Sequence, residues 1–132
     1  MIYLDTNIFI YPISGTGIKS ESCINILSKV FKGELEAATS ILTWDEFQYS
    51  LRKIIGKEKA IEESSIFLKS PNLKFIKADS EIISKAQELT EKYTLKPRDA
   101  IHAATAIINK IPKIVSDDSD FDKVKEIKRI KI

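Results

Sequence analysis

Four acidic side chains, spread over almost the whole chain, each adjoin an apolar segment. They are Asp5, Glu46, Asp99 and Asp118. A carboxylate beside a buried strand or on an apolar helix is costly to desolvate unless it is paired or binds a metal. Four of them, each placed where a fold could bring it to a common point, indicate a site for a divalent cation.

The donor set favours a hard cation, Mg²⁺ or Mn²⁺. Such ions prefer carboxylate oxygens and water, and the single cysteine and single histidine of the chain offer no competing zinc site. Without the ion the carboxylates repel one another, and some of their pKa values should rise. The same repulsion predicts that Asp5→Asn leaves the stability of the metal-free protein unchanged or higher.

Short apolar runs and helical patterns alternate along the chain and must position these acids. Strands are expected at 2–4, 36–41, 73–76, 113–115 and 127–130. Apolar residues at three- and four-residue spacing predict helices at 20–33, 43–56, 58–69, 79–93 and 97–109. A helical turn at 8–10 should be stopped by Pro12 and the glycines Gly15 and Gly17. Strands that alternate with helices indicate a parallel sheet covered on both faces.

The predicted topology places all four acids at one edge of that sheet. Open α/β sheets form their sites outside the carboxyl ends of the strands. Asp5 and Asp118 directly follow the first and fourth strands. Glu46 lies in the first turn after the second strand, and Asp99 lies in the first turn of the helix that leads into the fourth.

Each acid also has a purely local interpretation. Asp5 could cap the helical turn that follows it. Thr43 and Glu46 have the spacing of a capping box, with Thr43 as the N-cap. Asp99 in a first helical turn would gain from the helix dipole, and Asp118 could be an ordinary loop acid. These four interpretations are independent of one another, whereas a metal site explains all four together.

For most residues next to these acids, a structural role is favoured over a catalytic one. The only histidine, His102, follows Asp99 by three residues, and a packing or hydrogen-bonding role is favoured over that of a base. Trp44 and Phe47 flank Glu46 and are expected in the core rather than as platforms for base stacking. Arg98 could contact phosphate or offset the acidic charge.

Length and composition indicate one globular domain, residues 1–132. The chain is 43% hydrophobic and 30% charged, with a net charge of only +2, which neither demands nor excludes a nucleic-acid partner. Cys23 is expected in the core, since a single cysteine cannot form an internal disulfide. No apolar run is long enough to span a bilayer and the first residues lack a basic leader, so a cytoplasmic location without membrane contact is expected.

The ordered set of acidic motifs resembles the PIN domain family, and more narrowly its single-domain toxins of VapC type. The resemblance is carried by residues 5–7, Glu46 on a helix, 98–104 and 116–121. It extends from Met1 to about Phe121. It implies a three-layer α/β sandwich with a central parallel sheet of about five strands, and an acidic cluster that binds Mg²⁺ or Mn²⁺ to hydrolyse RNA phosphodiesters.

Carried over by position, the resemblance identifies a primary and a secondary set of site residues. The primary set, as metal ligands and catalytic residues, is Asp5, Glu46, Asp99 and Asp118. The secondary set is Asp120, Thr6 and Ser116, where Ser116 replaces the threonine of the family pattern and keeps its hydroxyl.

The resemblance also implies partners. We expect an RNA substrate, a homodimer, and a protein antitoxin whose C-terminal segment covers the acidic groove. Two other functions stay open at this point. One is a catalytically silent PIN-like module that binds RNA or protein, and the other is a related metal-dependent DNA nuclease.

Overall fold

A five-stranded parallel sheet lies at the centre of the computed structural model, which describes residues 1–132. The strands are β1 (Ile2–Leu4), β2 (Ala37–Ser40), β3 (Leu73–Ile76), β4 (Lys113–Val115) and β5 (Lys128–Ile130). Their order across the sheet is β3-β2-β1-β4-β5, and every neighbouring pair is parallel. Each of the five strands predicted from the sequence is therefore present.

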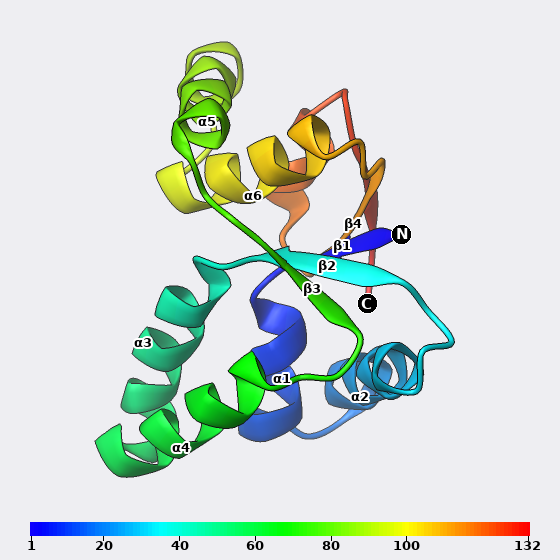
Figure 1. The fold of residues 1–132 in the computed structure, drawn as a ribbon, viewed down its shortest axis with the longest axis vertical. Coiled ribbons are helices and arrows are strands. Elements are labelled where there is room, and N and C mark those ends of the chain that lie inside the picture. Colours follow the sequence, from blue (N-terminus) through cyan, green and yellow to red (C-terminus); the bar gives the residue numbers. More distant parts are fainter.

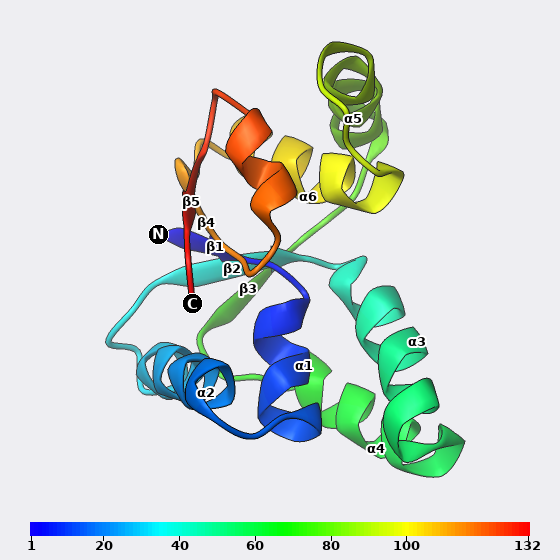
Figure 2. The same cartoon turned by 180° about the vertical axis from the view of Figure 1, so that it is seen from behind.

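Helices cover both faces of this sheet, as Figures 1 and 2 show from opposite sides. One face carries α1 (Asn7–Ser14), α2 (Ile18–Phe31), α3 (Thr43–Ile55) and α4 (Lys57–Leu68). The other carries α5 (Ser80–Lys92), α6 (Pro97–Ile108) and the short 3₁₀ helix η1 (Ser119–Lys123). The predicted three-layer sandwich is confirmed. No helix combines the length and the apolar character that a membrane crossing requires.

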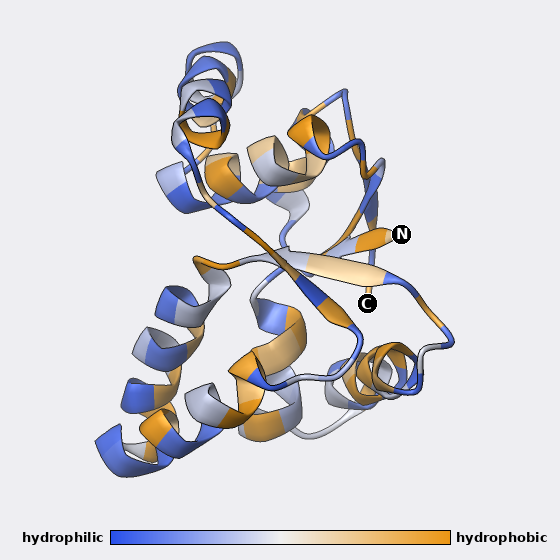
Figure 3. Ribbon diagram, in the orientation of Figure 1, coloured by the Kyte–Doolittle hydropathy of each residue, from blue (hydrophilic) through white to orange (hydrophobic).

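Two hydrophobic cores lie on opposite sides of the sheet, because successive strand residues point to opposite faces. In β1, Tyr3 faces the core beneath α5 and α6, whereas Leu4 faces the core beneath α1 to α4. Hydrophobic residues dominate α1 in Figure 3, whereas α2 is amphipathic and carries hydrophilic residues as well. Burial on both faces suits the central strand β1, which is apolar along its length, whereas the edge strands β3 and β5 carry the charged residues Lys74, Lys128 and Arg129.

The prediction that Pro12 stops the first helix is wrong, whereas the stop predicted at Gly15 is confirmed. Helix α1 continues through Pro12 to Ser14, and the Gly15 N–H closes the last turn on the Tyr11 carbonyl at 2.9 Å. Proline removes only its own N–H from a helix that ends two residues later, so the local loss is one hydrogen bond.

The predicted capping box at the start of α3 is also wrong. Leu42 occupies the N-cap position without a side-chain hydrogen bond, and Thr43 is the first helical residue. The Thr43 hydroxyl hydrogen bonds instead with the Thr39 hydroxyl of β2, at 2.7 Å. Glu46 is therefore not used to cap its own helix.

The two aromatic residues beside Glu46 differ in their surroundings. Phe47 is buried and stacks on Phe67 of α4 at a centroid distance of 4.8 Å, as expected for a core residue. Trp44 is 39% exposed, so the prediction that it lies in the core is wrong. It belongs to the first turn of α3, next to the exposed Ile41 and Leu42. Cys23 is fully buried and free, as expected.

Candidate metal centre

Three aspartates converge where α6 begins and β4 ends, and we call them the aspartate cluster. One carboxylate oxygen from each of Asp99, Asp118 and Asp120 lies within 4.8 Å of the other two. Asp99 stands in the first turn of α6, and Asp118 caps η1 by accepting the Asp120 N–H at 2.9 Å. The structure therefore places Asp120, a secondary candidate from the sequence, beside two primary ones.

The carboxylate of Asp99 lacks a hydrogen-bond partner and lies where its negative charge is unfavourable. Its Oδ2 is buried without any hydrogen-bond partner. Burial, followed by repulsion from Asp118 and Asp5, raises the pKa of Asp99 to about 7. The only other buried side-chain atom without a partner is Asn7 Oδ1, in the segment that follows β1. Unpartnered oxygens beside clustered carboxylates are the donors that Mg²⁺ and Mn²⁺ prefer, so the residues present fit such an ion.

Asp5, at the end of β1, is fixed by hydrogen bonds instead. Its Oδ1 accepts the Thr6 N–H at 2.7 Å, and its Oδ2 accepts the Ser116 hydroxyl at 2.6 Å and the Asn7 amide at 3.3 Å. The Ser116 hydroxyl in turn accepts the Asp118 N–H at 2.9 Å. Ser116 thus links Asp5 to the loop that carries the aspartate cluster.

Glu46 reaches the site from α3 and is fixed in a similar way. Its Oε1 accepts the Thr6 hydroxyl at 3.1 Å and lies 2.5 Å from His102 Nε2. Burial alone would raise the pKa of Glu46, but His102, Thr6 and the nearby Arg98 lower it. Glu46 also lines one cavity together with Asp99 and Asp118. We call Asp5, Thr6, Glu46, His102 and Ser116 the carboxylate network.

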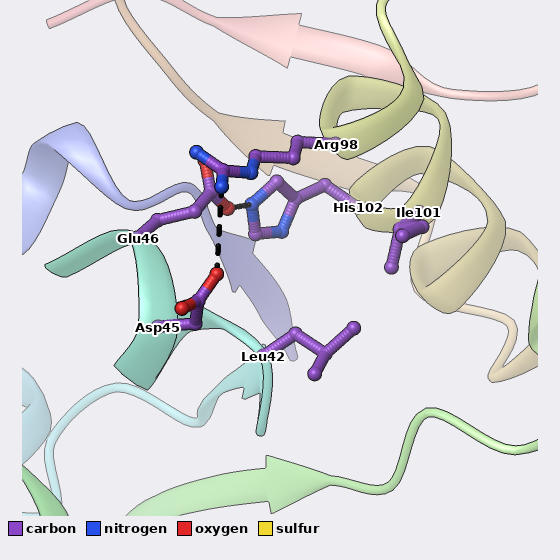
Figure 4. Close-up of a pocket in the computed structure, with 6 residues that line it drawn as sticks. All are labelled: Leu42, Asp45, Glu46, Arg98, Ile101 and His102. Atoms are coloured by element: carbon purple, nitrogen blue, oxygen red, sulfur yellow. Dashed lines mark hydrogen bonds and ion pairs between the residues drawn. The ribbon is translucent and has the colours of Figure 1, made fainter. Parts of the chain in front are cut away.

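His102 is buried between the two carboxylates of this network. Its Nε2 lies 3.6 Å from Asp5 Oδ1, and its Nδ1 lies 2.6 Å from the Tyr3 hydroxyl. Burial alone would lower the pKa of His102, but Tyr3, Glu46 and Asp5 together raise it well above its usual range. The hydrogen-bonding role expected for His102 is therefore present. Figure 4 shows its ring turned toward Glu46.

Two basic side chains stand at the rim of the cavity that Glu46, Asp99 and Asp118 share. They are Lys96 and Arg98, at the start of α6. Arg98 is 55% exposed, and its guanidinium lies 3.5 Å from Asp45, an ion pair visible in Figure 4. Such an exposed pair contributes little to stability. The guanidinium can therefore exchange Asp45 for a phosphate at low cost.

The four primary acids occupy the predicted edge of the sheet in two groups. Asp99 and Asp118 belong to the aspartate cluster, whereas Asp5 and Glu46 belong to the carboxylate network. Their roles as ligands stay predictions. Two polar residues near these acids were not among the predicted site residues. Asn7 lies only two residues after Asp5, which was the available signal, whereas Tyr3 has the pattern of an ordinary strand residue.

A family model described as "PIN domain" matches residues 2–127. The chain belongs to the PIN domain family. Ribonuclease VapC2 of Methanocaldococcus jannaschii is 25% identical to this PIN domain over 139 aligned residues, which cover 99% of the chain and 93% of the relative. Ribonuclease VapC6 of the same organism is 34% identical over 88 residues, 63% of the chain and 58% of the relative.

Solved structures agree with this fold. In the crystal structure of VapBC2 from Rickettsia felis bound to a promoter DNA fragment, one chain superposes with a TM-score of 0.77 at 25% identity, covering 99% of this PIN domain and 98% of that chain. VapC20 of Mycobacterium tuberculosis, a toxin that cleaves the sarcin-ricin loop, gives 0.75 at 16% identity with 95% of both chains covered. The second likeness shows the fold alone.

Proposed function

We propose that this PIN domain is a metal-dependent endoribonuclease and the toxin of a type II toxin–antitoxin pair. The family, the two relatives named as ribonucleases and the resemblance to a VapBC complex support this function. The observation that carries the proposal is the aspartate cluster, in which a buried Asp99 oxygen has no partner.

Mg²⁺ or Mn²⁺ would be held by the aspartate cluster, with Asp5 and Glu46 as further acidic ligands, directly or through water. When bound, such an ion polarises a phosphoryl oxygen and lowers the pKa of a bound water. Three half-buried carboxylates alone would repel a phosphodiester, so the cluster is suited to RNA only when its charge is offset.

The protein's own groups orient this chemistry. Ser116 couples Asp5 to the Asp118 loop, so the two acids keep a fixed relative position. Thr6 donates to Glu46 and holds it at the edge of the cavity. Arg98, exposed beside Glu46, offers a planar donor for a phosphate of the RNA backbone.

We further propose how this PIN domain is organised and which partners it binds. We treat residues 1–132 as one PIN-like domain, in agreement with the family match over 2–127. VapBC complexes among similar structures support a protein antitoxin as partner. A homodimer and a cytoplasmic location stay predictions of the same account.

The test compares RNA cleavage by wild type, Asp99→Asn and Glu81→Gln. Glu81 is the control because it also lies in the first turn of a helix, α5, but is exposed and far from the cluster in sequence, whereas Asp99 is half-buried in the first turn of α6. Cleavage should need Mg²⁺ or Mn²⁺, stop with a chelator, and fall more than about 100-fold in Asp99→Asn, since outer partners of a metal already contribute about 10–100-fold. Glu81→Gln should retain wild-type activity.

Two results would contradict this function. Cleavage that persists in chelator, or in Asp99→Asn, would remove the aspartate cluster from catalysis. Cleavage of flap DNA but not RNA by the wild type would favour the DNA nuclease, and the absence of Mn²⁺ or Mg²⁺ binding would favour the silent module.

A further inference from the structure

A continuous chain of buried hydrogen bonds crosses from the sheet to Glu46. The Ser40 N–H of β2 donates to the Tyr3 hydroxyl at 3.0 Å, and that hydroxyl lies 2.6 Å from His102 Nδ1. His102 Nε2 then lies 2.5 Å from Glu46 Oε1. Tyr3 and His102 are 0% and 1% exposed, so water does not compete for these bonds.

The direction of the bonds follows from what each group can do. A backbone N–H can only donate, so Ser40 occupies a lone pair of the Tyr3 oxygen and leaves the phenol proton for His102 Nδ1. The neutral ring then carries its proton on Nε2, which faces the Glu46 carboxylate. In the charged ring the bond to Tyr3 is reversed, with Nδ1–H donating to the second lone pair of the Tyr3 oxygen, and Nε2–H still donates to Glu46.

This arrangement leaves one Glu46 oxygen free. Both hydrogen bonds to the carboxylate, from His102 and Thr6, end on Oε1. The Glu46 side chain is 20% exposed and lines the cavity that also contains Asp99 and Asp118. Outer hydrogen bonds of this kind orient metal ligands and typically contribute about 10–100-fold to metal affinity or activity.

We propose that His102, held from behind by Tyr3, is a positioning residue that fixes Glu46 by Oε1 and presents Oε2 to the cation. The effect of His102 on catalysis rests on the proposed metal-dependent function, whereas the hydrogen bonds that it makes do not depend on that function. The role differs from that of a base, because the Nε2 lone pair is not available to substrate.

The first test reads the proton directly and needs neither metal nor RNA. His102 is the only histidine, so its two ring nitrogens give unambiguous ¹⁵N signals in the labelled full chain. With chelator present, Nε2 should be protonated and its proton should exchange slowly with water. A ring whose only proton is on Nδ1 would overturn the proposal, whether or not the protein cleaves RNA.

The second test measures the Mn²⁺ concentration for half-maximal RNA cleavage and, by calorimetry, Mn²⁺ affinity itself. His102→Leu should raise the Mn²⁺ requirement about 10–100-fold, while His102→Gln, which keeps a donor toward Glu46, should recover most of the loss. Tyr3→Phe removes only a hydroxyl and should shift the requirement less, in the same direction.

Thr105→Val is the matched control, since Thr105 is fully buried on α6 and its hydroxyl bonds only to the Ile101 carbonyl of the same helix. It should leave the Mn²⁺ requirement unchanged. Should His102→Leu fail to fold, Tyr3→Phe and His102→Gln decide the question. Wild-type Mn²⁺ affinity in folded His102→Leu, or in Tyr3→Phe if the leucine variant does not fold, would overturn the positioning role.

Discussion

The carboxylate network and the aspartate cluster both contain carboxylates, but they differ in how well the protein satisfies the hydrogen bonding of these groups. In the network, Asp5 accepts three hydrogen bonds and Glu46 accepts two, mostly from buried donors. In the cluster, Asp99 has a buried oxygen with no partner and a pKa raised to about 7. The protein therefore stabilises one half of its acidic site by itself and leaves the other half to a ligand.

Replacing one acid of each group by its amide should therefore change the stability of the metal-free protein in opposite directions. Asp5→Asn replaces one carboxylate oxygen by an NH2 group, which can only donate and would face either the Ser116 hydroxyl or the Thr6 N–H, both of which are donors already. We expect it to lower the free energy of unfolding of the metal-free protein by about 1–3 kcal/mol, measured by urea unfolding in chelator.

This expectation reverses the one drawn from charge repulsion alone, which predicted unchanged or higher stability for Asp5→Asn. Glu81→Gln again serves as the control. If Asp5→Asn unfolds at the same urea concentration as the wild type, the hydrogen bonds to Asp5 do not stabilise the fold and the two halves do not differ.

A smaller effect is expected at the junction between the halves. Ser116→Ala removes the donor to Asp5 and leaves the Asp118 N–H without its acceptor, a cost of about 1–2 kcal/mol. Thermal unfolding in chelator measures it, with Ser119→Ala as a control on an exposed serine of the same segment. Equal melting temperatures for the two variants would show that Ser116 does not couple the halves.

A third effect has the opposite sign and depends on pH. Because the pKa of Asp99 is raised above its unfolded value, the folded protein binds the Asp99 proton more tightly, and stability is lost as pH rises from about 4 to about 7. Asp99→Asn lacks this loss. In chelator it should match the wild type near pH 4 and unfold at a higher temperature at pH 8. A variant less stable than the wild type at pH 8 would contradict the assignment.

Much of this architecture was accessible from the sequence, because local patterns determined it. All five strands and the edge at which the acids meet follow from apolar runs alternating with helices. The helix predicted at 79–93 is α5, and the Asp79 side chain caps it by accepting the Ile82 N–H at 3.1 Å. The helix limits were less accurate: α1 runs through Pro12 and ends at Ser14, before Gly15.

The finer structure of the site depended on contacts between distant segments, which no local pattern contains. Thr43 and Glu46 have the spacing of a capping box. However, Thr43 hydrogen bonds with Thr39 of β2, and Glu46 hydrogen bonds with His102 of α6. Tyr3 has the pattern of a core residue and is one, but its hydroxyl also holds His102. The contrast between Asp5 and Glu46, which accept several hydrogen bonds, and Asp99, whose buried Oδ2 has no partner, becomes visible only in three dimensions.

The central claim is that the aspartate cluster binds a divalent cation, and metal-induced stabilisation tests it most directly. Melting temperatures of wild type, Asp99→Asn and Glu81→Gln would be measured in chelator and across a Mn²⁺ titration. Binding at a hundred times Kd stabilises the folded state by about 2.7 kcal/mol. We predict a saturable rise for wild type and Glu81→Gln and none for Asp99→Asn in the same range; an equal rise in Asp99→Asn would contradict the account.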